Sequence, residues 1–249
     1  MQKLFRRGYS NLVTLYASIT DVFRSANDIT FGLAVRDESD YTNYPRVIFF
    51  QSKLKKIDVD ELEKKFPAGS YVKIKAHIQT VPEYQKSNKM IPYQSLVGDS
   101  IESVLPEYVP DNKNEVFING YTENIRVARQ SNGLVRLTLH TKRANHDSYI
   151  HGLIFTDDPE QITDKIRAKD FIYTIGKVQT RRTAINGRWS VFEDIVIHEI
   201  YRENSETHKL RMLYGKENTT KIPMDKKTDV QLDFESSFVQ NSESRKENA

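Results

Sequence analysis

The chain contains no cysteine, and this absence removes several classes of function. Disulfide bonds, thiolate zinc sites and cysteine nucleophiles are all excluded. A long apolar run is also missing, because the stretch 12–19 is short and is broken by Thr14 and Ser18, so it does not suit a membrane span. Basic residues precede this stretch, but no small-residue cleavage site follows. We therefore expect a strand there instead of a signal peptide, and a cytoplasmic protein without a membrane segment.

The sequence signatures of catalysis are missing as well. The six histidines are scattered, and none has the His-x-x-x-His or His-Glu-x-x-His spacing of a zinc enzyme. There is no Walker-type glycine loop and no Gly-x-Ser-x-Gly elbow. The adjacent Asp157 and Asp158 resemble a metal-binding pair, but helix capping explains them without a metal. The sequence therefore predicts no enzyme, no metal and no cofactor, although a triad assembled only in space leaves no trace in sequence.

The net charge alone does not indicate what the chain binds. The 249 residues include 37 basic and 34 acidic side chains, for a formal net charge of +3. Such a small excess does not identify a nucleic-acid ligand, and the positions of the cations matter more than their number.

The chain contains an internal repeat. Residues 69–80 and 169–180 both alternate apolar and polar side chains and both end in an apolar residue followed by Gln-Thr. Alternation of this kind is typical of a half-buried strand. The similarity continues upstream, where residues 44–50 match residues 149–155, and each of these strands leads to a helical pattern at 58–66 and 157–166.

The full repeat predicts two small barrels. Asp158 is expected to cap the second helix, with Pro159 at its first position. Further strands are expected at residues 12–23, 29–36 and 101–104 in the first copy, and at 116–127, 134–141 and 197–200 in the second. One short helix between the third and fourth of five strands is the plan of the OB barrel. The predicted fold is all-β: two tandem OB-fold five-stranded barrels at residues 1–108 and 115–202, followed by a flexible, disordered tail at 203–249.

At these residues the chain resembles the bacterial, phage and plasmid single-stranded-DNA-binding protein (SSB) family. The third strand of that family carries an aromatic residue, a basic residue two positions later, an aliphatic run and a phenylalanine. Residues 44–50, followed by Lys53 and Leu54, fit this pattern well, and residues 149–155 fit it less tightly. The family also has a glycine turn and a strand ending in a Gln-Thr-like step, matched by residues 69–80. A long hairpin then carries an aromatic residue, matched by Tyr84.

Two departures limit what the resemblance implies. Family members often end in an acidic tail with an apolar tip that recruits repair proteins, whereas this chain ends in Arg-Lys-Glu-Asn-Ala. Most members have one barrel per chain and form tetramers, so two barrels per chain would reach four barrels as a homodimer.

The resemblance implies a function in binding single-stranded DNA during replication, recombination or transfer. Binding without sequence preference requires aromatic faces for the bases and a cationic groove for the phosphates. The candidate residues that combine these properties are Tyr44, Arg46, Phe50, Lys73, Lys75, Tyr84, Tyr93, Tyr149, Phe155, Lys177, Arg181, Arg182, Arg188 and Trp189. By strand alternation, Tyr44, Arg46 and Phe50 share a face, and one of Phe49 and Phe50 is expected in the core.

Two other functions remain open from the sequence. OB barrels also bind proteins, so the chain suits an adaptor in a replication or transfer complex. Stacking platforms bind RNA too unless the 2′-hydroxyl is read, so a single-stranded RNA is a third candidate ligand. The tail is expected to contact replication or transfer proteins, because residues 231–238 faintly resemble a sliding-clamp-binding peptide.

Overall fold

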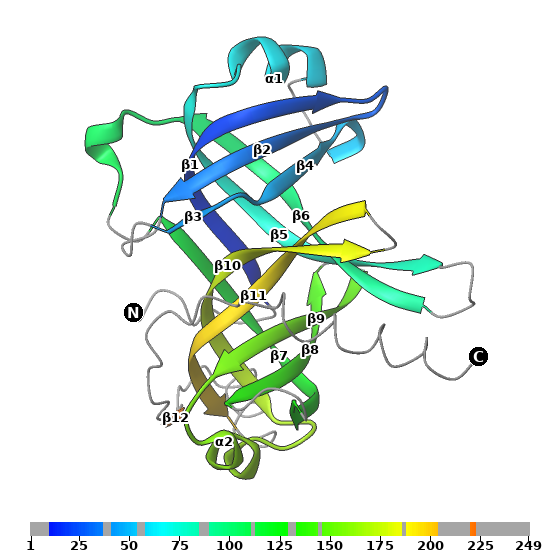
Figure 1. Cartoon of the computed structure of the whole chain (residues 1–249), viewed down its shortest axis with the longest axis vertical. Helices are drawn as coiled ribbons and strands as arrows, with labels where there is room; N and C mark the ends of the chain where they lie inside the picture. The colour runs from blue at the N-terminus through cyan, green and yellow to red at the C-terminus, as the bar shows by residue number, and fades with distance from the viewer. Residues whose placement is uncertain are drawn as a thin grey trace, which may run out of the picture.

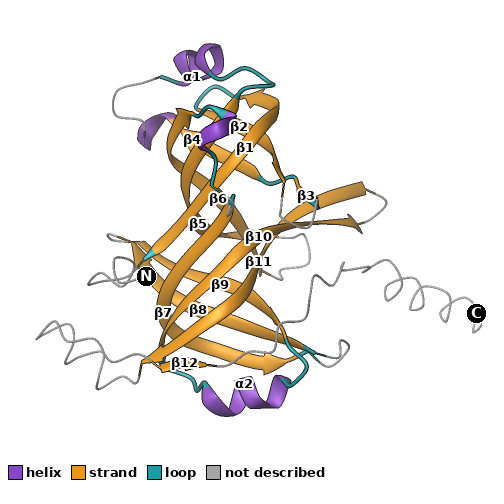
Figure 2. Ribbon diagram, turned by 90° about the vertical axis from the view of Figure 1, so that its left-hand side faces the viewer, coloured by secondary structure: helices purple, strands orange, loops and turns teal. Residues whose placement is uncertain are grey.

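The computed structural model describes residues 10–36, 41–53, 58–84, 90–110, 113–128, 133–143, 146–185, 188–203 and 220–222. Within these ranges the chain forms two β-barrels, arranged one above the other in Figure 1, with two α-helices at the far ends. Figure 2 shows the same arrangement from the side.

The first barrel closes through five strands. They are β1 (Asn11–Arg24), β2 (Asp28–Arg36), β4 (Arg46–Phe50), β5 (Tyr71–Tyr84) and β6 (Met90–Ser103), with the two-residue β3 (Thr42–Asn43) beside β2. Antiparallel pairing joins β1 to β2, β2 to β4, β5 to β6 and β5 to β1. Parallel pairing of β4 with β6 closes the ring, which gives the strand order of an OB barrel.

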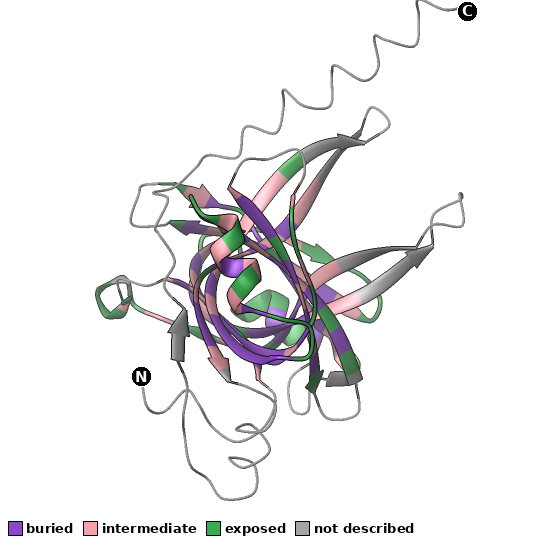
Figure 3. Ribbon diagram, turned by 90° about the horizontal axis from the view of Figure 1, so that it is seen from below, coloured by how far each residue is buried: buried purple, intermediate pink, exposed green. Residues whose placement is uncertain are grey.

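The second barrel repeats this topology. Its strands are β7 (Asn114–Val127), β8 (Leu134–Arg143), β9 (His146–Phe155), β10 (Phe171–Ile185) and β11 (Arg188–Glu203). Again the third and fifth strands, β9 and β11, pair in parallel, while the other four contacts are antiparallel. The predicted all-β fold with OB-type barrels is confirmed by this strand order, and buried positions recur along the barrel strands (Figure 3).

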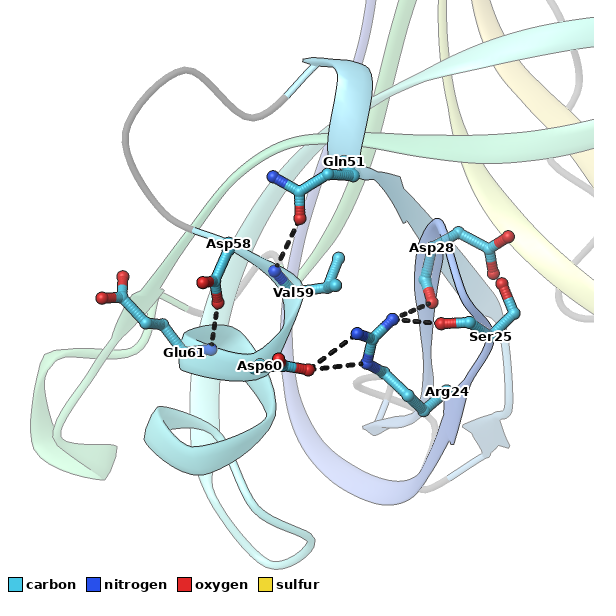
Figure 4. Close-up of polar contacts among 8 residues, drawn as sticks. All are labelled: Arg24, Ser25, Asp28, Gln51, Asp58, Val59, Asp60 and Glu61. Carbon is cyan, nitrogen blue, oxygen red and sulfur yellow. Dashed lines mark hydrogen bonds and ion pairs between the residues drawn. The ribbon is translucent and has the colours of Figure 1, made fainter.

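Short capped helices cover one end of each barrel. Helix α1 (Val59–Lys65) begins at Asp58, whose carboxylate accepts a hydrogen bond from the Glu61 amide at 2.8 Å. The Arg24 guanidinium at the end of β1 binds Asp60 at 2.7 Å and so fixes the helix to the barrel (Figure 4). Gln51, in the short η1 (Gln51–Lys53), accepts from the Val59 amide at 2.9 Å.

Helix α2 (Pro159–Lys165) begins as the sequence predicted. Asp158 is the N-cap and accepts from the Gln161 amide at 2.9 Å, and Pro159 occupies the first turn. Its buried residue, Ile162, packs into the core of the second barrel, as Leu62 of α1 does in the first.

A pair of buried asparagines shows how closely the two barrels repeat. Asn11 donates to the Ile78 carbonyl at 2.7 Å and accepts from the Ile78 amide at 2.9 Å. Asn114 makes the same two bonds with Val178, at 2.7 and 2.9 Å. Each side chain therefore completes a backbone ladder, joining the start of a barrel's first strand to the middle of its fourth.

The two barrels share one continuous sheet. Strand β1 pairs antiparallel with β7 over Asn11–Leu15 and Asn114–Ile118. The connection between the barrels contains a short 3-10 helix, η2 (Pro106–Tyr108).

Three parts of the chain differ from the sequence-based expectation. The closing strands are much longer than residues 101–104 and 197–200, because β6 begins at Met90 and β11 at Arg188. They pair with β5 and β10 as long hairpins beyond the barrels. In the tail, expected to be disordered, β12 (Thr220–Ile222) pairs antiparallel with β11 at Ile200–Arg202.

Candidate nucleic-acid interface

Hydrogen bonds join each barrel to the third strand of the other barrel or to the residues just before it. The Thr80 hydroxyl on β5 donates to the Tyr149 carbonyl on β9 at 2.7 Å. At the equivalent place in the other direction, the Tyr44 amide donates to the Thr180 hydroxyl on β10 at 3.0 Å. The Asn43 side chain strengthens the second contact by accepting from the Thr180 amide at 3.1 Å. The two Gln-Thr steps of the repeat therefore serve the junction between the barrels.

A second pair of contacts flanks the first. Gln94 on β6 donates to the His151 carbonyl at 3.1 Å and also accepts from the His151 amide. The equivalent residue on β11 is Glu193, which accepts from the Arg46 amide at 3.3 Å. The amide of Gln94 satisfies both backbone groups of its partner, whereas the second oxygen of Glu193 has no hydrogen-bond partner among the described residues.

The position of Glu193 favours the protonated form of its carboxyl group. Its side chain is buried between the barrels, and this burial raises the pKa of the carboxyl to about 7, against the smaller opposing effect of the Arg46 amide. A protonated carboxyl has a donor that a carboxylate lacks. The neutral form therefore matches the chemistry of Gln94 at the equivalent position.

The first barrel presents an exposed aromatic and cationic face at this junction. Tyr44 is 49% exposed, and Arg46 is exposed at the start of β4. The Arg46 guanidinium lies 5.4 Å from the ring centroid of Phe23, which is itself 50% exposed. Phe49 points into the core, 5.8 Å from Phe31, as alternation required for one of the two phenylalanines.

The second barrel presents a related face at the equivalent place. The Tyr149 ring is 46% exposed and stacks on His140, with 5.0 Å between ring centroids. Three exposed cations line the same outer surface of β7 and β8: Arg126 pairs with Arg136, and Lys142 lies six residues beyond Arg136 on the same face of β8. Like charges this close repel each other unless an anion lies between them.

Burial also affects a histidine on this face. The pKa of His151 is lowered, mainly by burial and further by the positive charge of Arg126. His151 is therefore neutral at physiological pH, and its Nδ1 lies 3.1 Å from the Thr138 hydroxyl.

Two predicted cations of the second barrel lie beside the face of the first. Arg181 and Arg182 follow Thr180 directly on β10, and Thr180 binds Tyr44. Arg181 is engaged by Asp194 at 2.7 Å and lies 5.0 Å from the Phe192 ring, whereas Arg182 is exposed. The sequence grouped both arginines with their own barrel, but the fold brings them to the other one.

The remaining predicted residues are dispersed. Lys73 binds Glu102 at 3.0 Å, a contact that raises its pKa, and it lies on the outer face of β5 with Lys75. Lys177 is half-buried on β10, and Phe50 and Phe155 are half-buried at the ends of β4 and β9. The side chains of four other predicted residues lie outside the described set: Tyr84, Tyr93, Arg188 and Trp189.

Sequence reasoning missed three residues of these faces. Phe23 was overlooked because a bulge between Ile19 and Asp21 changes which residues of β1 point outward, and a bulge leaves no clear sequence signal. Arg126 and His140 had a usable signal, since strict alternation along β8 places His140 on the same face as Arg136.

Within the described ranges, no group of three or more histidine and acidic side chains is placed to hold a metal ion. Over the same residues, neither helix has the length and apolar character needed to cross a membrane.

Comparison with solved structures finds proteins of the same fold. The wild-type single-stranded DNA binding protein from Thermus aquaticus superimposes with a TM-score of 0.52 at 15% sequence identity. The match covers 79% of this chain and 94% of the Thermus chain. A deletion mutant of the same protein gives 0.51, also at 15% identity, over 79% of this chain and 95% of that one.

The chain has the fold of the Thermus single-stranded DNA binding protein. No family model matches the sequence. No curated protein matches it either. The likeness to the Thermus protein extends over both barrels, because a match to 79% of this chain is longer than either barrel alone. The OB-type barrel fold expected from the SSB resemblance is therefore confirmed.

Proposed function

We propose that the chain binds single-stranded DNA without catalysis, by stacking bases on exposed aromatic side chains and neutralising phosphates with neighbouring cations. The observation that carries this proposal is the pair of related faces at the barrel junction. Each combines an exposed tyrosine, Tyr44 or Tyr149, with exposed arginines. Each tyrosine contributes a base-stacking surface that tolerates any sequence. The Thermus protein, a single-stranded DNA binding protein, shares the fold.

We further propose that the barrels are separate domains, at residues 1–108 and 115–202, and that the site is shared between them. Arg182 of the second barrel lies next to the strand of Tyr44 in the first. A strand passing from one face to the other would then contact both barrels in turn. A homodimer would present four barrels, and residues 203–249 would contact replication or transfer proteins in the cytoplasm.

A titration with labelled oligonucleotides tests the main proposal. Single-stranded DNA, duplex DNA and single-stranded RNA of equal length are titrated at two salt concentrations. Single-stranded DNA should bind most tightly, and its affinity should fall with salt. Equal or tighter binding of duplex DNA would contradict the proposal. Preference for RNA would instead support the single-stranded RNA binder, and no binding to any of the three would favour a protein-interaction adaptor.

A further inference from the structure

The exposed face of the first barrel (the first face) and that of the second barrel (the second face) can be compared position by position. Phe23 pairs with Thr30 in the first barrel, and Arg126 pairs with Arg136 at the same place in the second. A bulge interrupts the first strand of each barrel at the same distance before these pairs. Two different side chains at such matched positions therefore mark a difference between two copies of one surface.

The second face carries a pair of arginines where the first face has none. Arg126 and Arg136 lie directly opposite each other on β7 and β8, and both are exposed. Among the described residues no acidic side chain pairs with either arginine, and Asp147 on the same surface binds His140 at 3.0 Å instead. Like charges directly opposite each other on neighbouring strands repel. A phosphate bound by both arginines removes this repulsion and matches their hydrogen-bonding geometry.

At the matched positions the first face carries a phenylalanine and a threonine. Phe23 is 50% exposed, and the Arg46 guanidinium lies 5.4 Å from the centroid of its ring. Aromatic rings and guanidinium planes are the groups on which unpaired bases stack. The first face therefore offers a stacking surface where the second face offers paired positive charge.

An acidic side chain also lies on the first face. Asp21 pairs with Gly32, which pairs with Arg46 on its other side. The Asp21 carboxylate lies over Gly32, because a Cβ atom added to this glycine would collide with it. The second barrel has Asn124 and the neutral His151 at the positions of Asp21 and Arg46. The carboxylate repels phosphates and offsets the charge of Arg46, so the first face suits bases better than the backbone.

The tyrosines of the two faces also differ in their surroundings. One side of the Tyr149 ring stacks on His140, with 5.0 Å between centroids and 15° between the planes. Ala34 occupies the position of His140 in the first barrel. Among the described residues no aromatic ring stacks on Tyr44. Both sides of the Tyr44 ring are therefore free of a stacked neighbour, whereas Tyr149 offers one.

We propose that the two faces bind different parts of the DNA strand. The first face binds mainly bases, through Phe23 and Tyr44, and the second face binds mainly backbone phosphates, through Arg126 and Arg136. This inference rests on the proposed binding of single-stranded DNA and adds which barrel holds which part of the strand. The second face then supplies most of the salt-dependent affinity, and the first face supplies most of the affinity that requires bases.

Two oligonucleotides of equal length separate these contacts in the full chain. One is oligothymidine, and the other has the same backbone with an abasic site at every position. Phe23→Ala should weaken binding of oligothymidine roughly 5- to 150-fold, as expected for one lost stacking surface. The same variant should bind the abasic strand within about twofold of the wild type. Dissociation constants are measured by fluorescence anisotropy at about 50 mM salt, where phosphate contacts are strong.

The arginine pair should behave differently on the same two strands. Arg126→Ala with Arg136→Ala should weaken binding of both by the same factor, up to about 70-fold for two lost phosphate contacts at about 50 mM salt. Conservative variants control for folding. Phe23→Trp keeps a stacking ring, and Arg126→Lys with Arg136→Lys keeps both charges, so each should retain most of the wild-type affinity.

The two strands also distinguish failure of this inference from failure of the proposed function. If Phe23→Ala weakens both strands equally, or if the arginine pair matters only for oligothymidine, the division between the faces is wrong although DNA binding stands. The division is also wrong if the wild type binds oligothymidine but not the abasic strand. If the wild type binds neither strand, the proposed function and this inference fail together.

Discussion

A single buried carboxyl sets the pH response of the barrel junction. Burial raises the pKa of Glu193 from the ordinary 4.5 to about 7, so the folded chain binds this proton more tightly than the unfolded chain. The stability that Glu193 contributes is therefore fully present below pH 4.5 and is lost as pH rises through about 7. At pH 8 the buried carboxylate costs up to about 3 kcal/mol of unfolding free energy.

Glu193→Gln should remove this dependence, because an amide makes both bonds at the equivalent position, Gln94. Melting temperatures of the variant and the wild type should agree at pH 4.5 and diverge above pH 7, with the variant more stable. The reverse change, Gln94→Glu, should introduce a similar loss of stability at high pH. A difference between Glu193→Gln and wild type that does not vary with pH would show that Glu193 does not titrate.

The exposed tyrosines should carry a measurable share of DNA affinity. Tyr44→Ala and Tyr149→Ala each remove a ring available for stacking, which is worth roughly 1–3 kcal/mol per base, or roughly 5- to 150-fold in dissociation constant. Tyr108→Ala is the matched control, because Tyr108 is 73% exposed in η2 and belongs to neither face. Binding by fluorescence anisotropy should separate the three variants, with melting temperatures unchanged. Equal losses in all three would remove the two faces from the site.

The strands of each barrel depend on a buried asparagine that replaces part of a backbone ladder. Asn11→Ala leaves the amide and carbonyl of Ile78 buried without their partner, and each such group costs about 1–3 kcal/mol. We expect a loss of about 2–4 kcal/mol in unfolding free energy by urea denaturation, and a similar loss for Asn114→Ala. The exposed Asn124→Ala provides the control and should change stability little. A loss below 1 kcal/mol for both buried positions would contradict this role.

The paired arginines on β7 and β8 should set the salt dependence of the second face. Arg126→Ala with Arg136→Ala should reduce the slope of log affinity against log salt by about 1.4, because each lost phosphate contact contributes about 0.7. Lys64→Ala with Lys65→Ala, on exposed positions of α1, matches the charge change away from the face. A slope that responds equally to both pairs would mean that only net charge matters.

Strand periodicity explains which elements could be predicted from sequence. Residues 72–78 alternate cleanly, so β5 and its counterpart in the second barrel, β10, were expected, and the predicted helix cap at Asp158 follows from local hydrogen bonding. The starts of β6 and β11 were missed because a hairpin arm that leaves the barrel has no buried face to impose alternation. The partners of Asn11 and Thr80 are 67 and 69 positions distant, and no local pattern reveals contacts over such separations.

At the scale of the whole molecule, the junction makes each exposed aromatic face a product of both barrels. Thr180 and Glu193 of the second barrel hold the backbone of Tyr44 and Arg46 in the first, and Thr80 and Gln94 act in the opposite sense. From the sequence, each barrel was expected to use its own aromatic and basic residues, because a repeat suggests independent copies. The antiparallel pairing of β1 with β7 joins the two copies in one sheet, and no local sequence pattern reveals it.

The only tryptophan allows this shared arrangement to be tested. Trp189 lies on β11 of the second barrel and pairs with Ala184 of β10, the strand whose Thr180 accepts from the Tyr44 amide. Stacking of a base on the indole should quench its emission.

With an oligonucleotide of about six nucleotides, short enough to engage one face, Arg46→Ala in the first barrel should weaken binding as measured by quenching. Arg136→Ala, in the barrel that contains Trp189, should leave the same titration unchanged, because its face lies on the other side of the junction. The opposite pattern, with only Arg136→Ala weakening the signal, would mean that each barrel binds DNA with its own residues alone.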